Sequence, residues 1–226
     1  IRFEHVSFSY DGKRDVLKDI SFDVKNGQTI AFVGHTGSGK SSIINLFMRF
    51  YEFDRGQILI DGQDIKDYSQ EALRRSIGLV LQEPFLYHGT IASNIRMYHE
   101  ELTDEEIRQA AAFVDVADFI ESLPGGYDHP VTERGSTLST GQRQLLAFAR
   151  TIAAQPKILI LDEATANIDQ ETEEMIQNSL KKMRQGRTTI AIAHRLSTIQ
   201  DADCIYVLDK GKIIESGNHD QLIALG

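Results

Sequence analysis

The sequence has a single cysteine, no long apolar run and a shortage of basic residues. Each of these argues against one kind of bond, segment or partner. Cys204 is the only cysteine among 226 residues, so an intramolecular disulfide is excluded. It lies in the apolar run CIYVLD, where we expect a small core residue. No stretch approaches the ~18 apolar residues that a membrane-spanning helix needs, and we expect no signal peptide at the start.

Basic residues are outnumbered, because 24 Lys and Arg stand against 33 Asp and Glu and give a formal net charge of −9. Non-specific binding to nucleic acid relies on Lys and Arg to neutralise phosphates, so we expect no nucleic-acid partner. The remaining composition, 41% hydrophobic and 25% charged, is typical of a globular domain, and the length fits one domain with an inserted lobe. Since residues 1–10 already read as a strand, we expect a domain of a longer protein.

Short β-rich runs alternate with helical segments along the chain. Residues 1–10 and 19–24 alternate in polarity, as half-buried antiparallel strands do. Near-continuous apolar runs, typical of strands in a buried parallel sheet, cover 29–34, 77–82, 157–162 and 188–194. We predict helices over 39–50, 139–154 and 170–184, a helix-rich stretch broken by loops over 104–122, no strand between 84 and 150, and a hairpin that turns at Lys210-Gly211. The pattern predicts an α/β fold with a helical lobe.

The stretch GHTGSGKS, Gly34–Ser41, matches the phosphate-loop pattern G-x-x-x-x-G-K-[ST] between a predicted strand and a predicted helix. Gly34, Gly37 and Gly39 allow the backbone to curl so that successive N–H groups face one anion. Lys40 is predicted to reach the β- and γ-phosphates of a nucleotide, and the Ser41 hydroxyl to bind Mg²⁺. The alternative, a glycine-rich turn with a solvated lysine, does not account for the strand–loop–helix setting.

Two acids directly follow the apolar run at residues 158–161. Acids at the end of a buried strand are costly unless a metal or a partner needs them. Asp162 is therefore predicted to hold Mg²⁺ through water or through Ser41, and Glu163 to polarise an attacking water as general base. The alternative is that both acids cap the next turn.

Two further polar residues end apolar runs. His194 is predicted to contact the γ-phosphate or to orient the water, and Gln82 to reach Mg²⁺ and the water. Taken alone, His194 would more often be a core or edge residue, and Gln82 would indicate no function. Both gain a role only beside the phosphate loop and the acids.

The stretch LSTGQRQ, Leu138–Gln144, opens one of the predicted helices. A Ser followed by free backbone N–H groups at a helix start is a ready site for an anion. The chain therefore carries a second candidate phosphate site, far from the first in the sequence.

With Tyr10, the phosphate loop, Gln82, LSTGQ, the acids, ANID at 166–169 and His194 in this order, the sequence resembles the ATP-binding cassette (ABC) domains over essentially its whole length. The resemblance is closest to the nucleotide-binding domains of membrane exporters, and LSTGQ is its most specific motif. It implies a P-loop NTPase (RecA-like) core with an antiparallel β subdomain and an inserted helical signature subdomain. Residues 1–226 would form this one domain, with the helical subdomain at about 84–154 and the rest at about 1–83 and 155–226. The chain lacks the N-K-x-D motif of guanine-binding proteins, which argues against a GTPase.

The resemblance also implies the ligands, ATP and Mg²⁺, and the residues that bind them. Tyr10 would stack on adenine, and Val16 would pack near the ribose and the base. The implied nucleotide-binding set is Tyr10, Val16, Gly34, His35, Thr36, Gly37, Ser38, Gly39, Lys40, Ser41 and Ser42. The implied catalytic residues are Lys40, Gln82, Glu163 and His194, and the implied metal ligands are Ser41, Gln82 and Asp162.

In the ABC family two cassettes stack head to tail, and the signature of one caps the ATP of the other. Ser139, Thr140, Gly141 and Gln142 would therefore act on the ATP of a second cassette. ATP would join the two cassettes and hydrolysis would release them, which is a nucleotide switch. The segments 83–95 and 132–135 resemble those that meet transmembrane coupling helices. The resemblance thus implies an export motor at the cytoplasmic face of the cell membrane.

One residue departs from the family pattern L-S-G-G-Q, because Thr140 stands where the first glycine is usual. Its β-branch disfavours a positive φ and crowds a phosphate that approaches closely. The site that this signature completes on the partner should be the weaker one. We therefore expect a heterodimer whose other member has degenerate catalytic elements but a good signature, and the alternative is a homodimer that tolerates Thr.

Two other functions are compatible with a cassette. One is a soluble ABC-family ATPase that is not attached to a transporter, but such proteins carry long coiled-coil or inter-cassette insertions that this sequence lacks. The other is a binding module that responds to nucleotide without hydrolysis, and the presence of Glu163 and His194 argues against it.

Overall fold

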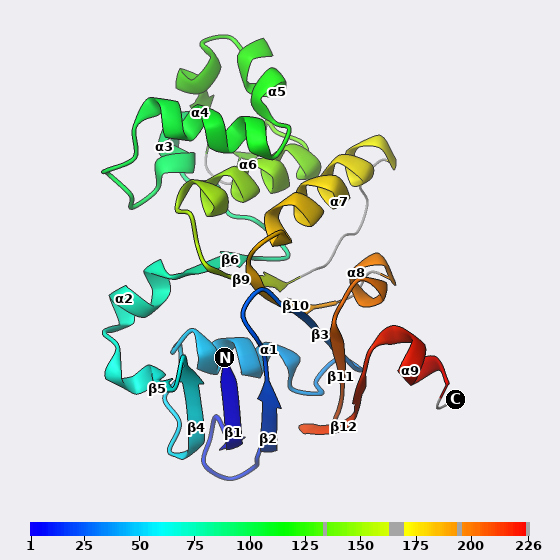
Figure 1. Cartoon of the computed structure of the whole chain (residues 1–226). Coiled ribbons are helices and arrows are strands. Elements are labelled where there is room, and N and C mark those ends of the chain that lie inside the picture. The colour runs from blue at the N-terminus through cyan, green and yellow to red at the C-terminus, as the bar shows by residue number, and fades with distance from the viewer. Residues whose placement is uncertain (133–134, 163–169, 194–195, 225–226) are drawn as a thin grey trace. The chain divides into compact units, whose positions relative to one another are not determined.

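The computed structural model describes residues 1–132, 135–162, 170–193 and 196–224. The chain divides into two compact units. Unit 1 comprises residues 1–77, 157–163 and 186–226, and unit 2 comprises residues 78–156 and 164–185. Each unit is built from segments that are far apart in the sequence, and Figure 1 labels their elements.

Unit 1 holds an antiparallel sheet of order β2-β1-β4-β5. Its strands are β1 (Arg2–Phe8), β2 (Leu17–Asp23), β4 (Arg55–Ile60) and β5 (Gln63–Asp64). The predicted antiparallel pairing of the first two runs is confirmed, since Phe3 lies opposite Phe22 and Val6 opposite Ile20. Their apolar side chains are buried while the residues between them face outward, as the alternation in the sequence requires.

The second sheet has the order β12-β11-β3-β10-β9-β6. Its strands are β3 (Thr29–Val33), β6 (Ile77–Val80), β9 (Ile158–Asp162), β10 (Thr188–Ile192), β11 (Cys204–Asp209) and β12 (Lys212–Gly217). Parallel pairing joins β11 to β3, β3 to β10 and β10 to β9, which confirms the prediction for three of the apolar runs. The carboxyl ends of β3 and β9 therefore lie at the same edge of the sheet, which brings the phosphate loop and Asp162 to one side of unit 1.

The helices of unit 1 connect and cover these strands. They are α1 (Lys40–Phe47), the short 3-10 turn η1 (Ile65–Asp67), α2 (Gln70–Arg75), α8 (Leu196–Gln200) and α9 (His219–Ile223). Four buried phenylalanines from α1 and the two sheets pack against one another. Phe3 stacks on Phe22 with ring centroids 4.3 Å apart and also meets Phe47 of α1 at 6.1 Å. Phe22 contacts Phe32 of β3 at 5.1 Å, so aromatic burial fixes α1 and the phosphate loop against both sheets.

The hairpin of β11 and β12 turns at Lys210-Gly211, as predicted, and both residues have positive φ, 47° and 82°. Cys204 opens β11 and is only partly buried, so the expectation of a core cysteine is wrong. Cys204 is the first residue of this strand, and its burial there is intermediate.

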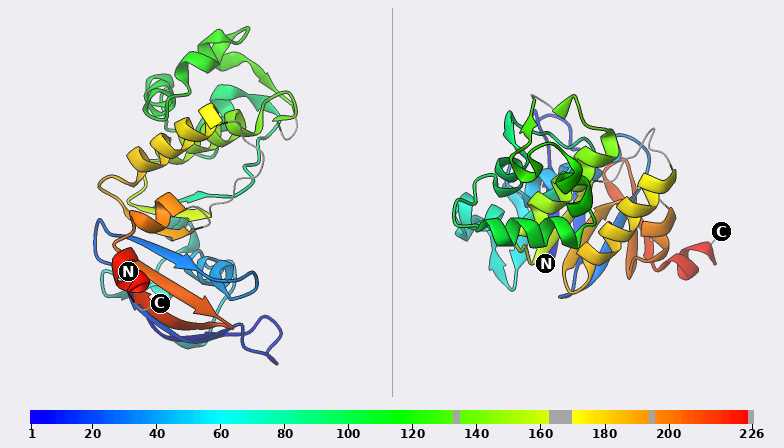
Figure 2. Two further views of the ribbon diagram at one scale, coloured as in Figure 1. Left: turned by 90° about the vertical axis from the view of Figure 1, so that its right-hand side faces the viewer. Right: turned by 90° about the horizontal axis from the view of Figure 1, so that it is seen from above.

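Unit 2 is mainly helical (Figure 2). Its helices are α3 (Ile91–Arg96), α4 (Asp104–Phe113), α5 (Ala117–Ser122), the 3-10 turn η2 (Gly126–Asp128), α6 (Thr140–Ala153) and α7 (Gln170–Arg184). The prediction of no strand in this region is wrong, because β7 (Gly89–Thr90) pairs with β8 (Pro130–Val131). Two-residue strands give no periodicity, so the sequence holds no signal for them.

Helix α6 is the central helix of unit 2, with α4 and α7 against it (Figure 2). Its buried residues include Leu145, Leu146 and Phe148. Helix α7 is attached through polar contacts as well, since the Ser179 hydroxyl donates to the Val114 carbonyl at 3.0 Å and Lys182 pairs with Asp115 at 2.6 Å. Within the described part of the chain, no helix has the length and apolar character that crossing a membrane requires.

Tyr206 on β11 is expected to make unit 1 sensitive to alkaline pH. Its ring packs against both Phe22 and Phe32, and burial together with the nearby Cys204 side chain raises the pKa of the phenol from 10.0 to about 12. The unfolded chain ionises this phenol near pH 10, so its contribution to stability is complete below pH 10 and is lost as the pH rises toward 12.

An absorbance titration of phenolate should therefore show late components in the folded protein that are missing in urea, one from Tyr206 and one from Tyr127, because burial raises the pKa of Tyr127 as well. Tyr206→Phe should remove one of these components and reduce the loss of unfolding free energy above pH 10, while Tyr127→Phe should leave the Tyr206 component in place. A titration in which Tyr206→Phe removes no late component would contradict the assignment.

Candidate functional site

The glycine loop joins β3 to α1 in unit 1, in the strand–loop–helix setting that the sequence predicts. Gly34, Gly37 and Gly39 have φ of 152°, 80° and 110°, all in the region that favours glycine. Gly34 also lies so close to β11 that an added Cβ would overlap the Leu208 carbonyl oxygen. The loop is closed by a bond from the Ser38 amide to the His35 carbonyl at 3.1 Å. This curled backbone has the form that an anion site needs.

Lys40 lies inside the loop and is 7% exposed. Its Nζ donates to the carbonyl oxygens of Gly34 at 2.6 Å and His35 at 3.0 Å, and to Ser38 Oγ at 3.4 Å. Burial lowers the pKa of the ammonium group, while the negative charge of Asp162 opposes this shift. The ammonium group of Lys40 is thus held inside the loop by neutral acceptors. A bound phosphate would offer charged oxygens in their place.

The other loop residues differ in exposure. His35, Thr36 and Gly37 are exposed, Ser38 and Gly39 are buried, and Ser41 is exposed in the first turn of α1.

Asp162, a predicted metal ligand, is half-buried at the end of β9. Ser41 and Asp162 offer hydroxyl and carboxylate oxygens, which are the donor types that Mg²⁺ prefers. Among the described residues, no group of three or more His, Cys, Asp or Glu side chains is arranged as a metal site.

Tyr10, Val16 and Gly37 line one cavity of about 480 Å³ in unit 1. The structure therefore brings together three residues that the sequence assigned to nucleotide binding. The remaining lining residues are Asp11, Arg14, Asp15, Lys18 and Lys210. Three of these are basic and were not predicted, because they come from parts of the chain that are far apart: Arg14 and Lys18 from the end of the β1–β2 loop and the start of β2, and Lys210 from the β11–β12 turn. Tyr10 is 47% exposed, which leaves ring surface available to a ligand.

The signature stretch forms the start of α6 in unit 2. Ser139 is the N-cap residue, and its Oγ accepts from the Gln142 amide at 3.1 Å while Gln142 Oε1 accepts from the Ser139 amide at 2.9 Å. This reciprocal capping fixes both side chains. In this capping pair the Ser139 hydroxyl oxygen acts as an acceptor. Gly141 is buried, whereas Ser139 and Thr140 are exposed.

The argument that the β-branch of Thr140 disfavours a positive φ does not apply here. Thr140 is the first residue of α6 and has helical backbone geometry, so no positive φ is required of it. Its Oγ1 accepts from Arg143 Nη2 at 3.1 Å, and Arg143 Nη1 donates to the Leu138 carbonyl at 2.7 Å. Compared with glycine, Thr140 adds bulk at the exposed helix start and accepts a hydrogen bond from Arg143.

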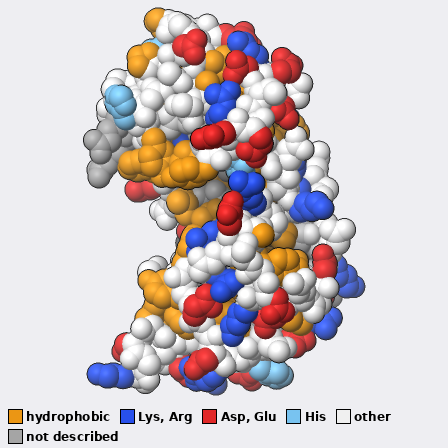
Figure 3. Space-filling view, turned by 90° about the vertical axis from the view of Figure 1, so that its left-hand side faces the viewer, with side chains coloured by type: hydrophobic (Ala, Val, Ile, Leu, Met, Phe, Trp, Pro, Cys, Tyr) orange, Lys and Arg blue, Asp and Glu red, His pale blue; other side chains and the backbone are white. Residues whose placement is uncertain are grey.

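The segment that was predicted to meet a coupling helix carries exposed aromatic residues. Phe85 and Tyr87 are 40% and 44% exposed and contact each other edge to face at 4.8 Å. The face of the molecule in Figure 3 carries hydrophobic side chains among interspersed acidic and basic ones. Gln82 precedes this segment and is exposed in unit 2, two residues after the end of β6.

Arg150 of α6 holds this segment. No local pattern indicates that role, because its partners lie 56 and 65 residues away. The guanidinium donates to the Asn94 carbonyl at 2.7 Å, to Asn94 Oδ1 at 3.1 Å and to the Phe85 carbonyl at 3.0 Å. It also lies over the Tyr87 ring at 5.8 Å. Burial lowers the pKa of Arg150. The segment and the signature helix are thereby joined within unit 2.

Several predicted residues lie outside the described part of the chain. These are Glu163, His194, residues 166–169 and residues 133–134 of the second segment predicted to meet a coupling helix. Their roles stay predictions from the sequence.

Comparisons with known proteins agree on a family. The family model described as ABC transporter matches residues 17–166. A putative ABC transporter ATP-binding protein, exp8 of Streptococcus pneumoniae serotype 4, is 75% identical over all of this chain, which spans 39% of that protein. A probable multidrug resistance ABC transporter ATP-binding/permease protein, YheH of Bacillus subtilis strain 168, is 55% identical, and the chain spans 33% of it.

A solved structure of a bacterial Atm1-family ABC exporter with ATP bound is also similar, with a TM-score of 0.91 and 45% sequence identity. The match covers 99% of this chain and 39% of that one. The predicted P-loop NTPase fold with an antiparallel β subdomain is thus confirmed. The chain belongs to the ABC transporter family.

Proposed function

We propose that this chain is the ATP-binding and ATP-hydrolysing motor domain of a membrane exporter. The observation that carries the proposal is the glycine loop with Lys40 buried at its centre, in a chain of the ABC transporter family. The relatives support export, since YheH is described as a probable multidrug resistance ATP-binding/permease protein and the similar structure is of an exporter with ATP bound. The chain spans 39% of exp8 and 39% of the exporter chain. In a protein of that length, the residues outside this domain would supply the transmembrane part.

One half of the ATP site lies in unit 1. The base would enter the cavity of Tyr10 and Val16, and the phosphates would lie over the loop at residues 34–42, where Lys40 would exchange carbonyl partners for phosphate oxygens. Ser41 and Asp162 would hold Mg²⁺, which would neutralise charge on the β- and γ-phosphates. The effect of Asp162 on the pKa of Lys40 supports this arrangement, because it requires the two charges to be near each other.

The chemical step would be in-line attack of water on the γ-phosphate. Glu163 would polarise the water as general base, His194 would orient it or contact the γ-phosphate, and Gln82 would link the metal to the water. All three follow short apolar runs in the sequence.

The other half of each site would come from a second cassette. Ser139, Gly141 and the free amides at the start of α6 would cap the γ-phosphate that the partner holds, because a helix N-terminus favours an anion. Binding of ATP would join the cassettes, hydrolysis would separate them, and the exposed segment around Phe85 and Tyr87 would pass the motion to transmembrane coupling helices. The domain would lie at the cytoplasmic face of the cell membrane.

ATP hydrolysis by the native polypeptide that carries this chain tests the proposal. We expect Mg²⁺-dependent turnover in the membrane fraction, alone or with a second cassette polypeptide, and loss of turnover when Lys40 is replaced. A polypeptide that is recovered from membranes but turns over no ATP with any partner cassette would contradict a motor function.

The second member of the pair is predicted to be a different cassette. Thr140 adds bulk where a phosphate must approach, so the site that this signature completes should be the weaker one. Thr140→Gly is expected to raise ATP turnover several-fold in a homodimer, and to change it little in a heterodimer whose partner already has degenerate catalytic residues.

Turnover is to be measured for the protein alone and mixed with candidate partner cassettes. Thr137→Gly, a change of the same kind two residues before Ser139, serves as the matched control. Rapid hydrolysis by the homodimer that Thr140→Gly leaves unaltered would favour a homodimer instead.

A further inference from the structure

The ring of Tyr10 is held by hydrogen bonds to helix α1. Asn45 Nδ2 donates to Tyr10 Oη at 3.1 Å, and Tyr10 Oη lies 3.0 Å from Ser42 Oγ. Either hydroxyl can be the donor between Tyr10 and Ser42. Ser42 and Asn45 are three residues apart on α1 and therefore lie on one face of the helix. The aromatic end of the cavity is in this way tied to the helix that follows the phosphate loop.

Two aromatic rings hold the same side chain from its edges. Phe8 and Tyr51 each contact the Tyr10 ring with centroids 4.8 Å apart and interplanar angles of 80° and 84°. Edge-to-face packing of this kind is favourable and fixes ring orientation. Tyr51 does not line the cavity that holds Tyr10 and Val16, so its contact with Tyr10 is not part of the ligand surface.

The loop that carries Tyr10 is also fixed in its backbone. The Val16 amide donates to the Phe8 carbonyl at 2.8 Å and closes the loop at its base. The Asp11 carboxylate accepts from the amides of Lys13 at 2.8 Å and Arg14 at 3.1 Å, and these bonds lower the pKa of Asp11.

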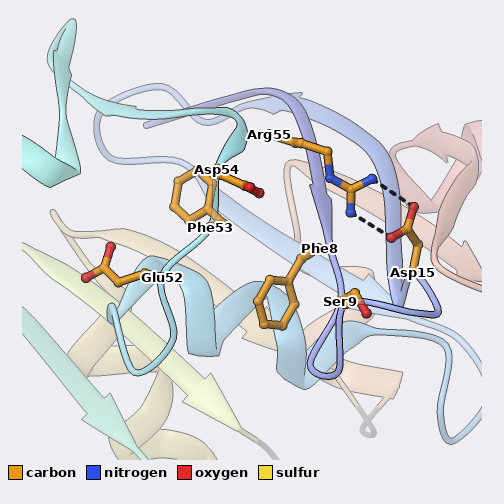
Figure 4. A pocket seen from close by; sticks show the side chains of 8 residues that line it. Phe8, Ser9, Asp15, Glu52, Phe53, Asp54 and Arg55 are labelled. Carbon is orange, nitrogen blue, oxygen red and sulfur yellow. Dashed lines mark hydrogen bonds and ion pairs between the residues drawn. The ribbon is translucent and has the colours of Figure 1, made fainter.

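A bidentate ion pair anchors the far side of this loop. Asp15 pairs with Arg55 of β4 at 2.6 and 3.0 Å, and Figure 4 shows the pair beside Phe8. With the loop fixed at its base, its tip and its far side, the remaining freedom of Tyr10 is the rotation of its side chain. Asn45, Ser42, Phe8 and Tyr51 restrict that rotation.

We propose that Asn45 and Tyr51 are positioning residues that hold the Tyr10 ring ready for the adenine base, and that they set the affinity for ATP without touching it. The inference rests on the proposed function, because it assumes that Tyr10 receives the base. A side chain whose rotation is already restricted loses less entropy when a ligand binds. Loss of either contact should therefore weaken binding of the base and leave the chemistry at the phosphates unaltered.

A double-mutant cycle tests the hydrogen-bond contact. In the native polypeptide, Asn45→Leu is expected to raise the Kd for a non-hydrolysable ATP analogue about fivefold, the value of one net hydrogen bond. Tyr10→Phe removes this bond and also the bond between Tyr10 and Ser42, so it should cost at least the same factor. In the Tyr10→Phe background, Asn45→Leu should have no further effect. Additive losses would show that Asn45 acts through helix α1 and not through Tyr10, and would overturn the proposal.

Steady-state kinetics test the ring contact. Tyr51→Leu is expected to raise KM for ATP roughly threefold to tenfold with kcat unchanged, while Tyr51→Phe keeps the ring and should behave like the wild type. Phe50→Leu is the matched control, because Phe50 is the neighbouring exposed aromatic, 48% exposed, and lies against Arg74 instead of Tyr10. An equal rise in KM for Phe50→Leu would mean that the segment as a whole was disturbed, and would overturn a specific role for Tyr51.

A ligand without a base separates this inference from the proposed function. Asn45→Leu and Tyr51→Leu should leave the affinity for Mg²⁺-tripolyphosphate at the wild-type value, since that ligand does not reach Tyr10. If the two variants bound both ligands more weakly by the same factor, the effect would lie in the phosphate loop. That result would overturn this inference but not the proposed function. A wild-type protein that binds tripolyphosphate and ATP equally would overturn the assignment of Tyr10 to the base. A protein that binds neither would overturn the proposed function.

Discussion

Replacing Lys40 with Ala is expected to weaken ATP binding by about 10- to 100-fold and to abolish measurable turnover. Hydrogen bonds to a charged group contribute about 1.5–3 kcal/mol, and each 1.4 kcal/mol is a factor of ten in affinity. Lys40 is the cation inside the loop, 7% exposed and held by the carbonyl oxygens of Gly34 and His35. Without it, the phosphates would keep the backbone amides but lose their charged partner.

Calorimetric titration with ATP measures the loss, and a thermal melt shows whether each variant is folded. Lys40→Met serves as a second variant, because it keeps the volume of the buried chain and removes only the charge. Lys13→Ala, an exposed cation in the loop after β1, is the matched control and should bind ATP normally. A folded Lys40→Met protein with wild-type affinity would contradict the assignment of the loop to the phosphates.

Replacing Glu163 with Gln is expected to leave ATP affinity unchanged and to slow hydrolysis by about 10²- to 10⁴-fold, the usual contribution of a general base. The amide keeps the size of the side chain but cannot accept the proton of the attacking water. Because ATP then persists between the cassettes, the variant should also accumulate as an ATP-bound dimer.

Single-turnover hydrolysis and light scattering with and without ATP measure the two effects. Glu171→Gln changes an exposed acid at the start of α7 in the same way and should alter neither the hydrolysis rate nor the dimerisation. If Glu163→Gln hydrolysed ATP at the wild-type rate, the base would have to be another residue.

The parts of the fold that could be predicted are those with short-range causes. The phosphate loop needs glycines with positive φ and a lysine at one spacing, so Gly34–Lys40 can be read directly from the chain. The hairpin at Lys210-Gly211 follows from a turn pair between two apolar runs. Helix α7 has the predicted bounds, 170–184, because its buried residues recur at helical spacing.

The parts that could not be predicted depend on contacts between distant segments. The hydrogen bonds of Tyr10 join residues 32 and 35 positions apart, and those of Arg150 join residues 56 and 65 apart. No local pattern encodes such contacts. At Thr140 the local argument gave the wrong result, since the family glycine suggested a special backbone conformation and the structure has an ordinary helix start.

Gly211 joins three parts of unit 1 at one point. Its amide donates to the Ser38 carbonyl of the glycine loop at 3.0 Å, its carbonyl accepts from the Lys18 amide at 2.8 Å, and a Cβ there would overlap the Val16 carbonyl oxygen. A support of the glycine loop therefore comes from the last quarter of the polypeptide. A shortened fragment designed to retain the nucleotide pocket has to extend through β12, although every residue of the glycine motif lies in the first fifth of the sequence.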